Sequence, residues 1–185
     1  NVGVDATILD SEIIKLPNGE DILNGTQKYS EGHPVREWFT YHFEGVDQMT
    51  GRSLYTIDPE QKAAAEKASA LVTINGQDYT TVTTYGMKDW CGKATPSMYG
   101  AITSNLTWKD LSLGMTFTYS LGGKVYDSSY RSLMTGSATS AGALHEDALK
   151  SWNGVPAGMT ETSSNRIDPN GIPSMDFYYA SDNNS

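Results

Sequence analysis

The most regular hydrophobic pattern in the chain runs from Leu111 to Leu121. Every second residue of this run is apolar or aromatic, and the residues between them are small and uncharged. Strict period-two alternation predicts a β-strand with one apolar and one polar face. Strands of soluble proteins usually have about 5–6 residues, whereas a tilted membrane-spanning strand needs about 9–11. The run is therefore long for a soluble strand, but it suits both a half-buried strand and a membrane strand.

A second alternating run, from Met98 to Trp108, comes directly before the first. Only Lys109 and Asp110 separate the two runs, which predicts an antiparallel hairpin with a two-residue turn. Membrane barrels pair their strands in this way, with tight turns at the periplasmic end and long loops outside.

The two possible environments place the same side chains differently. In a barrel, Leu113, Met115 and Phe117 face outward, and Trp108 and Tyr119 lie in the aromatic belts at the two membrane interfaces. In a soluble sandwich, these side chains pack in a core between two sheets.

The remaining pattern is weaker and predicts an all-β chain with long connections. We expect strands at 1–9 and 36–44 and short helices at 58–71 and 143–152. The last of these carries apolar residues on one helical stripe. The segment 153–185 is rich in Gly, Pro, Asn and Ser and is predicted to be an extended loop. Loops of this length tend to be functional.

Composition narrows the classes of partner. The net charge of −9 and the pI near 4.7 argue against a nucleic-acid partner, because phosphate binding needs a concentrated Lys/Arg surface. A single cysteine, Cys91, rules out an internal disulfide. No stretch approaches the roughly 20 apolar residues of a membrane-spanning helix. The chain begins without Met or a signal peptide and ends in a polar run, so we expect it to be an excerpt of a longer protein.

The usual catalytic and metal-binding patterns are missing from the sequence. His145 and Glu146 open like a zinc-protease motif, but Leu149 occupies the position of the second histidine. Asp168 and Asn170 offer oxygen ligands of the kind that calcium uses, yet their spacing does not match an EF-hand, which favours Asx turns. The sequence therefore predicts no catalytic, cofactor-binding or metal-binding residue.

Several short motifs follow one another along almost the whole chain. They are EGHP at 31–34, GVDQMTG at 45–51, GKATP at 92–96, WKDLSL at 108–113, SLGGKVYD at 120–127 and HEDALKSW at 145–152. Each motif alone is weak, but the ordered set is similar to that of SusC/RagA-type TonB-dependent outer-membrane receptors.

The resemblance implies a fold and a function. The fold is a transmembrane antiparallel β-barrel with long extracellular loops that carry short helices. Residues 1–185 form part of one such barrel domain, with the plug domain and the closing strands outside the chain. The implied function is energy-coupled import of glycans or peptides across the outer membrane of a Gram-negative cell, without catalysis. The implied partners are the lipid bilayer, a SusD-like surface lipoprotein and the TonB complex, which engages parts absent here.

Recognition in a barrel falls to the loops, because the strand faces are committed to lipid and lumen. The candidate contacts for cargo or partner are aromatic and acidic residues of the segment that follows the hairpin: Trp152, Tyr178, Tyr179, Asp168 and Asp176. Trp152 has two interpretations. It either contacts the lipoprotein or anchors the loop onto itself, as buried loop aromatics commonly do.

A second function remains open from the sequence. A secreted carbohydrate-binding or adhesin-like β domain needs no membrane and uses aromatic side chains as sugar-stacking platforms. Its candidate platforms are Trp38, Trp90, Trp152, Tyr178 and Tyr179.

Overall fold

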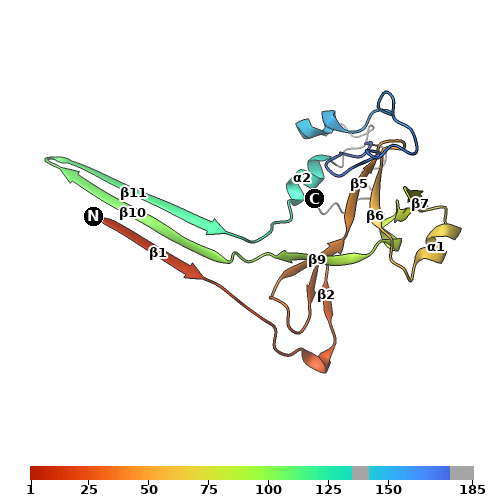
Figure 1. The fold of residues 1–185 in the computed structure, drawn as a ribbon. Coiled ribbons are helices and arrows are strands. Elements are labelled where there is room, and N and C mark those ends of the chain that lie inside the picture. The colour runs from red at the N-terminus through yellow and green to blue at the C-terminus, as the bar shows by residue number, and fades with distance from the viewer. Residues whose placement is uncertain (135–141, 176–185) are drawn as a thin grey trace. The chain divides into compact units, whose positions relative to one another are not determined.

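The computed structural model describes residues 1–134 and 142–175, and it consists mainly of β-strands joined by loops and short helical turns (Figure 1). The chain divides into two compact units. Unit 1 contains Asn1–Phe39 and Trp90–Tyr126, and unit 2 contains Thr40–Asp89 and Asp127–Ser185. The strand pairs described below are antiparallel. The predicted all-β class, with short helices in the connections, is confirmed.

The long hairpin of unit 1 has the bounds that the alternating pattern predicted. Strand β10 covers Met98–Trp108 and strand β11 covers Leu111–Leu121, and they pair from Met98 opposite Leu121 to Trp108 opposite Leu111. Lys109 begins the turn with a φ of 52°, a left-handed conformation usually left to Gly or Asn. Two residues suffice for the reversal because Lys109 accepts this conformation.

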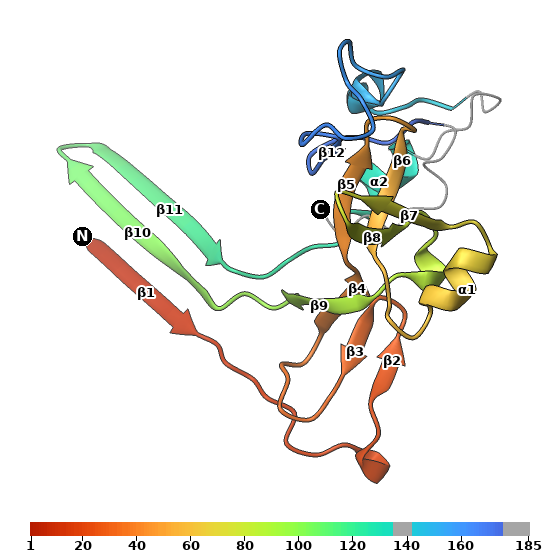
Figure 2. The same ribbon diagram turned by 45° about the vertical axis from the view of Figure 1, so that its right-hand side comes forward.

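A third strand, β1 (Val2–Ile8), extends the hairpin into a sheet of order β1-β10-β11. Figure 2 shows the three strands side by side. β1 runs antiparallel to β10, with Val2 opposite Ser104 and Ile8 opposite Met98. The predicted strand at 1–9 is therefore confirmed to within one residue at each end.

A four-stranded sheet has the order β2-β3-β4-β9. Its strands are β2 (Ile22–Asn24), β3 (Gln27–Tyr29), β4 (Glu37–Tyr41) and β9 (Lys88–Lys93), and the 3₁₀ turn η1 (Pro17–Gly19) precedes β2. The predicted single strand at 36–44 is wrong, because β4 ends at Tyr41 and β5 begins at Phe43. His42 separates the two strands. Its N–H donates to the carbonyl of Met87, and its own carbonyl accepts from the N–H of Thr56.

The five-stranded sheet of unit 2 has the order β12-β5-β6-β8-β7. Its strands are β5 (Phe43–Asp47), β6 (Arg52–Thr56), β7 (Leu71–Ile74), β8 (Gln77–Thr80) and β12 (Ile167–Asp168). A hydrophobic core of Leu54, Ile74 and Tyr79, with Val72 and Ile167 packed against it, stabilises this sheet. Between residue 44 and the long hairpin the sequence pattern predicted only a helix at 58–71, so strands β6, β7 and β8 were not predicted.

The helical segments are shorter than the sequence pattern suggests. Helix α1 covers only Lys62–Lys67 of the predicted 58–71, because Ser69 turns left-handed with a φ of 54° and β7 begins two residues later. The predicted helix at 143–152 is a 3₁₀ turn, η3 (Glu146–Lys150). Helix α2 (Ser128–Met134) and the turn η2 (Thr83–Tyr85) were not predicted.

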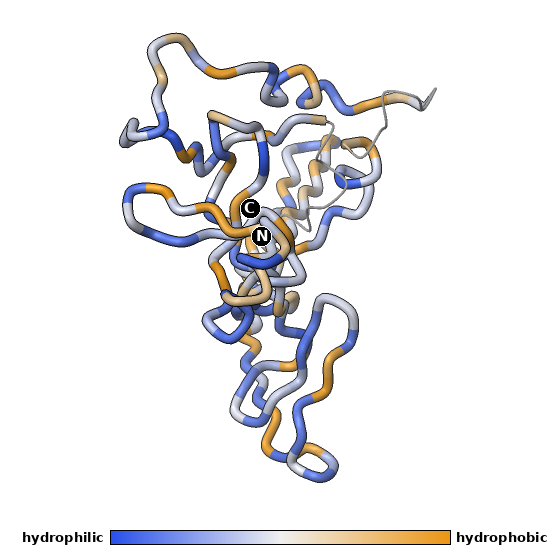
Figure 3. The backbone as a smooth tube through the Cα atoms, turned by 90° about the vertical axis from the view of Figure 1, so that its right-hand side faces the viewer, coloured by the Kyte–Doolittle hydropathy of each residue, from blue (hydrophilic) through white to orange (hydrophobic). Residues whose placement is uncertain are grey.

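Buried apolar side chains are unevenly divided between the two units. Among the described residues, Leu16 is the only buried hydrophobic residue of unit 1, whereas the others lie in unit 2. Hydrophobic and hydrophilic residues are interspersed along the traced chain (Figure 3). None of the helices within 1–134 and 142–175 is long and apolar enough to cross a membrane.

Candidate functional site

One face of the β1-β10-β11 sheet carries large apolar side chains along its whole length, interrupted in β10 by Gly100 and Ser104. Residues opposite each other in an antiparallel pair point to the same face, so the register brings the apolar sets of the three strands together. The large apolar members of this face that are exposed are Val2, Val4, Ile8, Ile102, Leu106, Trp108, Leu111, Leu113, Met115, Phe117 and Leu121. Exposed apolar surfaces of this extent mark contacts with a protein or a membrane.

The fractional exposure of this face bears on one of the two environments predicted for the hairpin. A core between two sheets would bury Leu113, Met115 and Phe117, yet they are 50%, 41% and 64% exposed. The residues of the polar face of β11 are exposed as well, so the assignment of Leu113, Met115 and Phe117 to the outside of a barrel stays a prediction.

The opposite face of the same sheet is polar and almost uncharged. It presents mainly Ser, Thr and Asn side chains from β10 and β11, together with Tyr99 and Ala101. Asp5 on β1 is the one side chain of the three strands that is charged at neutral pH. One of its carboxylate oxygens, Oδ1, accepts a hydrogen bond from the Ala101 N–H at 3.2 Å. The sheet therefore separates an apolar surface from a surface rich in hydroxyl groups.

Tyr119 joins all three strands on the apolar face. It lies opposite Gly100 of β10, and its hydroxyl donates to the Asp5 carbonyl of β1 over 2.9 Å. The side chain has this path because Gly100 lacks a Cβ, which would collide with the Asp5 carbonyl and approach the Tyr119 hydroxyl to 2.6 Å. The place of Tyr119 in an aromatic belt stays a prediction; in the structure its hydroxyl has a partner within the sheet.

The tryptophans proposed as sugar platforms make contacts within the protein. The Trp90 ring stacks on His33, with centroids 3.9 Å apart, and the Phe39 ring lies 5.0 Å away. The indole N–H of Trp38 donates to the Lys124 carbonyl at 2.9 Å. The stacked His33 ring covers one face of Trp90, and that face cannot stack on a sugar. The Trp38 hydrogen bond lies at the edge of its ring, so the carbohydrate-binding alternative stays open for Trp38.

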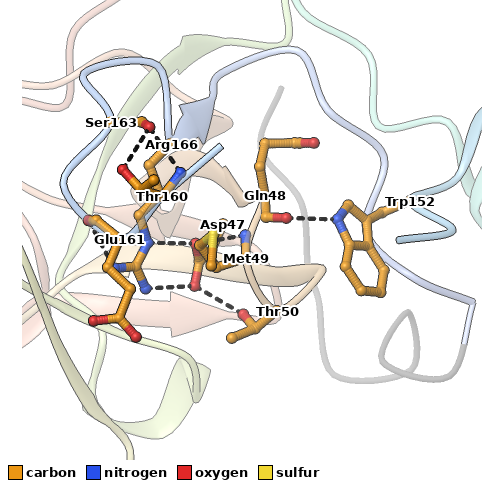
Figure 4. Close-up of polar contacts among 9 residues, drawn as sticks. All are labelled: Asp47, Gln48, Met49, Thr50, Trp152, Thr160, Glu161, Ser163 and Arg166. Carbon is orange, nitrogen blue, oxygen red and sulfur yellow. Dashed lines mark hydrogen bonds and ion pairs between the residues drawn. The ribbon is translucent and has the colours of Figure 1, made fainter. Parts of the chain in front are cut away.

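The GVDQMTG motif forms the turn between β5 and β6, and Asp47 organises it (Figure 4). Asp47 is 1% exposed, and the Arg166 guanidinium binds both of its carboxylate oxygens, Nε to Oδ1 at 2.8 Å and Nη2 to Oδ2 at 3.0 Å. The Met49 N–H and the Thr50 hydroxyl donate to the same carboxylate at 3.1 and 2.9 Å. All of these partners are donors, so they stabilise the ionised form.

The pKa of Asp47 follows from two opposing causes. Burial raises the pKa of a carboxyl group, but hydrogen bonds from Arg166, Met49 and Thr50 and the charge of Arg166 outweigh burial here. The net effect holds the pKa of Asp47 below its ordinary value of 3.8. Asp47 and Arg166 thus form a buried ion pair at neutral pH, and this pair fixes the segment before β12 to the β5–β6 turn.

Trp152 fixes a second part of the same segment to that turn. Its indole N–H donates to the Gln48 carbonyl at 2.9 Å, and its backbone N–H donates to the Ile172 carbonyl. The ring packs directly on Gly51, where any Cβ would collide with it, and Gly51 has a φ of 69°. These contacts support the interpretation of Trp152 as an anchor of the loop.

The 3₁₀ turn η3 precedes Trp152 and exposes a different side chain. His145 caps the turn by accepting from the Asp147 N–H at 3.1 Å, and the Asp147 carboxylate binds Lys150 and the Tyr130 hydroxyl. Leu149 points into solvent and is 89% exposed. The apolar helical stripe predicted for 143–152, which includes Leu149 and Trp152, is therefore wrong, since a 3₁₀ turn does not repeat with the period of an α-helix.

The other predicted contact residues separate into two groups. Asp168 lies in β12, where its Oδ1 accepts from the Asn170 N–H at 3.0 Å, the Asx turn that the sequence favoured. Asp176, Tyr178 and Tyr179 lie outside the described residues. The ion pair of Asp47 and Arg166 was missed, because nothing in the local pattern connects two residues 119 positions apart.

Comparison with protein-family models gives no match, and neither does comparison of the sequence with curated proteins. Among solved structures, the fold is similar to that of a chain in the "Structure of the RagAB peptide transporter", with a TM-score of 0.54 and 20% sequence identity. The match covers 88% of this chain and 16% of that chain. This chain therefore spans about one sixth of the length of that protein. At this identity the likeness shows the fold alone: an antiparallel all-β arrangement found within a transporter.

Proposed function

We propose that the chain is part of an outer-membrane importer of the SusC/RagA type, which moves glycans or peptides through a plugged β-barrel and catalyses no reaction. The observation that carries this proposal is the exposed apolar face of β1, β10 and β11 backed by a polar, nearly uncharged face. Hydrocarbon on one side and a hydrated lumen on the other is the environment that this division of side chains fits.

The length of the strands supports the same conclusion. Each strand of the hairpin has 11 residues, which at about 3.3 Å per residue gives about 36 Å. Tilted by about 35–45°, as in known barrels, such a strand spans about 26–30 Å, close to the apolar band of about 25 Å. A strand built for a soluble sandwich rarely needs this length.

We propose that substrate and partner recognition belongs to unit 2. Its segment 142–175 is held by Arg166 and by Trp152, so it is a preorganised surface rather than a free loop. Preorganisation lowers the entropic cost of binding. By this proposal the exposed Leu149 contacts a SusD-like lipoprotein, and Trp152 holds the turn that presents Leu149. The TonB complex would act on parts of the protein outside this chain.

The proposal is tested by affinity purification of the tagged full-length protein from separated outer membranes, extracted in mild detergent. We expect the protein in the outer-membrane fraction, together with a lipid-anchored partner and bound glycan or peptide detectable by mass spectrometry. Recovery of the protein from the soluble fraction, with no lipid-anchored partner, would contradict the proposal and favour the secreted β domain.

A further inference from the structure

The apolar face of the β1-β10-β11 sheet continues up to the end of the hairpin. Trp108 and Leu111 are the last residues of the two strands, they lie opposite each other, and each is 68% exposed. Only Lys109 and Asp110 follow before the chain reverses. The hairpin therefore has no polar margin between its apolar surface and its turn.

Lys109 places its charge on the apolar side of this turn. Its ammonium lies 5.1 Å from the centre of the Trp108 ring, and Trp108 belongs to the apolar face. In the part of the chain that the structure describes, no carboxylate lies within ion-pair distance of this ammonium. The cation over the indole is thus available to an anion that approaches from the apolar side.

We propose that the turn binds a phospholipid headgroup, with the Lys109 ammonium on the lipid phosphate and the Trp108 indole at the boundary of the hydrocarbon. This inference rests on the proposed function, because it requires that the apolar face contacts a bilayer. Indole rings prefer the headgroup level, where one edge is apolar and the other is wet. A lysine beside such a ring keeps its charge near the negatively charged lipid surface. Short turns lie on the periplasmic side of barrels, so the lipid is a phospholipid of that leaflet.

The test uses the full-length protein in vesicles of phosphatidylcholine, with and without added phosphatidylglycerol. Flotation of the vesicles in a density gradient after an alkaline wash reports insertion, and urea titration reports the equilibrium constant for unfolding. We expect phosphatidylglycerol to stabilise the wild type relative to Lys109→Gln by about fivefold in this constant, the effect of one lysine near an anionic surface. Lys109→Arg should retain the stabilisation, because it keeps the charge.

Lys88→Gln is the matched control, since Lys88 also lies over an aromatic ring, 4.8 Å from the centre of Tyr41, but outside the β1-β10-β11 sheet. This variant should respond to phosphatidylglycerol as the wild type does. If the protein floats with the vesicles but Lys109→Gln responds like the wild type, the headgroup site is wrong while the membrane assignment stands. If the protein does not float, the proposed function fails, and the headgroup site fails with it.

Discussion

Tyr119 shows at the residue scale how the apolar face accommodates a polar group. A hydroxyl exposed to hydrocarbon costs free energy unless it has a hydrogen-bond partner, and the Asp5 carbonyl supplies one across Gly100. We predict that Tyr119→Phe lowers the free energy of unfolding in lipid by about 0.5–1.5 kcal/mol, the usual contribution of one hydrogen bond. Tyr99→Phe on the polar face is the control and should change it little. Equal losses for the two variants in urea titration would show that the bond to Asp5 has no special role.

Gly100 provides a second test of the contact between Tyr119 and Asp5. A methyl group at this position would collide with the Asp5 carbonyl and crowd the Tyr119 hydroxyl, so Gly100→Ala should destabilise the sheet in the same titration by more than Tyr119→Phe. Gly114, whose added Cβ would meet only the Asn105 side chain at 3.1 Å, is the matched glycine in β11. Gly114→Ala should be the milder of the two glycine variants.

The buried pair of Asp47 and Arg166 makes the loop of unit 2 sensitive to pH. Because the folded-state pKa of Asp47 is lowered, its stabilisation is complete above the ordinary value of 3.8 and is lost as the pH falls through the lower folded-state pKa. We predict that amide hydrogen exchange at Thr50 and Gly51, corrected for the intrinsic rate, accelerates only below about pH 4.

Replacing Arg166 should destabilise the β5–β6 turn more than lowering the pH does. Arg166→Ala leaves a buried carboxylate unpaired, which typically costs about 3–5 kcal/mol, and it should raise the pKa of Asp47 and move the acid transition upward. Arg166→Lys keeps the charge but loses the two-point geometry, so its stability should lie between that of the wild type and that of Arg166→Ala. An unchanged exchange profile in Arg166→Ala would mean that the pair does not hold the turn.

Residue-scale patterns in the sequence located part of this site and missed the rest. The motif at 45–51, which contains Asp47, was recognised because its order along the chain resembled a family pattern, but Asp47 itself was not singled out. Its partner Arg166 carries no local signal and is selected only by the fold. Trp152 was recognised as a candidate contact. Whether it contacts a partner or anchors the loop was left open, because an indole at the end of a helical pattern fits both roles.

At the scale of elements, the hairpin β10–β11 defines the predicted membrane surface. We predict that Met115→Arg, on the apolar face near the middle of β11, lowers the stability of the reconstituted protein by about 2–4 kcal/mol. The neighbouring Thr116→Arg lies on the polar face and should cost less. Similar losses in the two variants would contradict the assignment of the faces.

The turn η3 permits a separate prediction about the partner. Leu149→Asp should leave expression unchanged, because its side chain is 89% exposed, and should abolish co-purification of the lipid-anchored partner. Trp152→Ala should instead reduce expression, since it removes the anchor on Gln48 and Gly51. Normal co-purification with Leu149→Asp would remove this turn from the interface.

The elements differ in how far their sequences predict them. The hairpin at 98–121 was predicted to the residue, because eleven alternating positions on each side of a two-residue break leave one register. The short strands of unit 2 were missed, although Asn75-Gly76 between β7 and β8 is a strong hairpin signal, with φ of 51° and 81°. The Ala-rich sequence before it favoured a long helix, and pairing with β8 overrode that local preference from Leu71 onward.

At the scale of the whole molecule, the two units differ in where their apolar side chains lie. Unit 2 buries them around Leu54, Ile74 and Tyr79, as a soluble domain does. Unit 1 buries almost none among its described residues and exposes them on one continuous sheet face. Burial of apolar surface is the dominant force in folding, and under the proposed function the bilayer would supply to unit 1 the apolar environment that its own core does not. The pairing of β1 with β10 completes this face, and no local sequence signal could have predicted it.

The most direct measurement of that environment is a scan of nitroxide labels along β11. The full-length protein, with Cys91 replaced by Ser, is reconstituted into vesicles and labelled one position at a time across residues 112–117. We predict that collision with dissolved oxygen, which concentrates in hydrocarbon, alternates with period two and peaks at Leu113, Met115 and Phe117. A water-soluble nickel chelate should not reach these three positions. A flat oxygen profile, or ready access of the chelate to Leu113, Met115 and Phe117, would contradict the account.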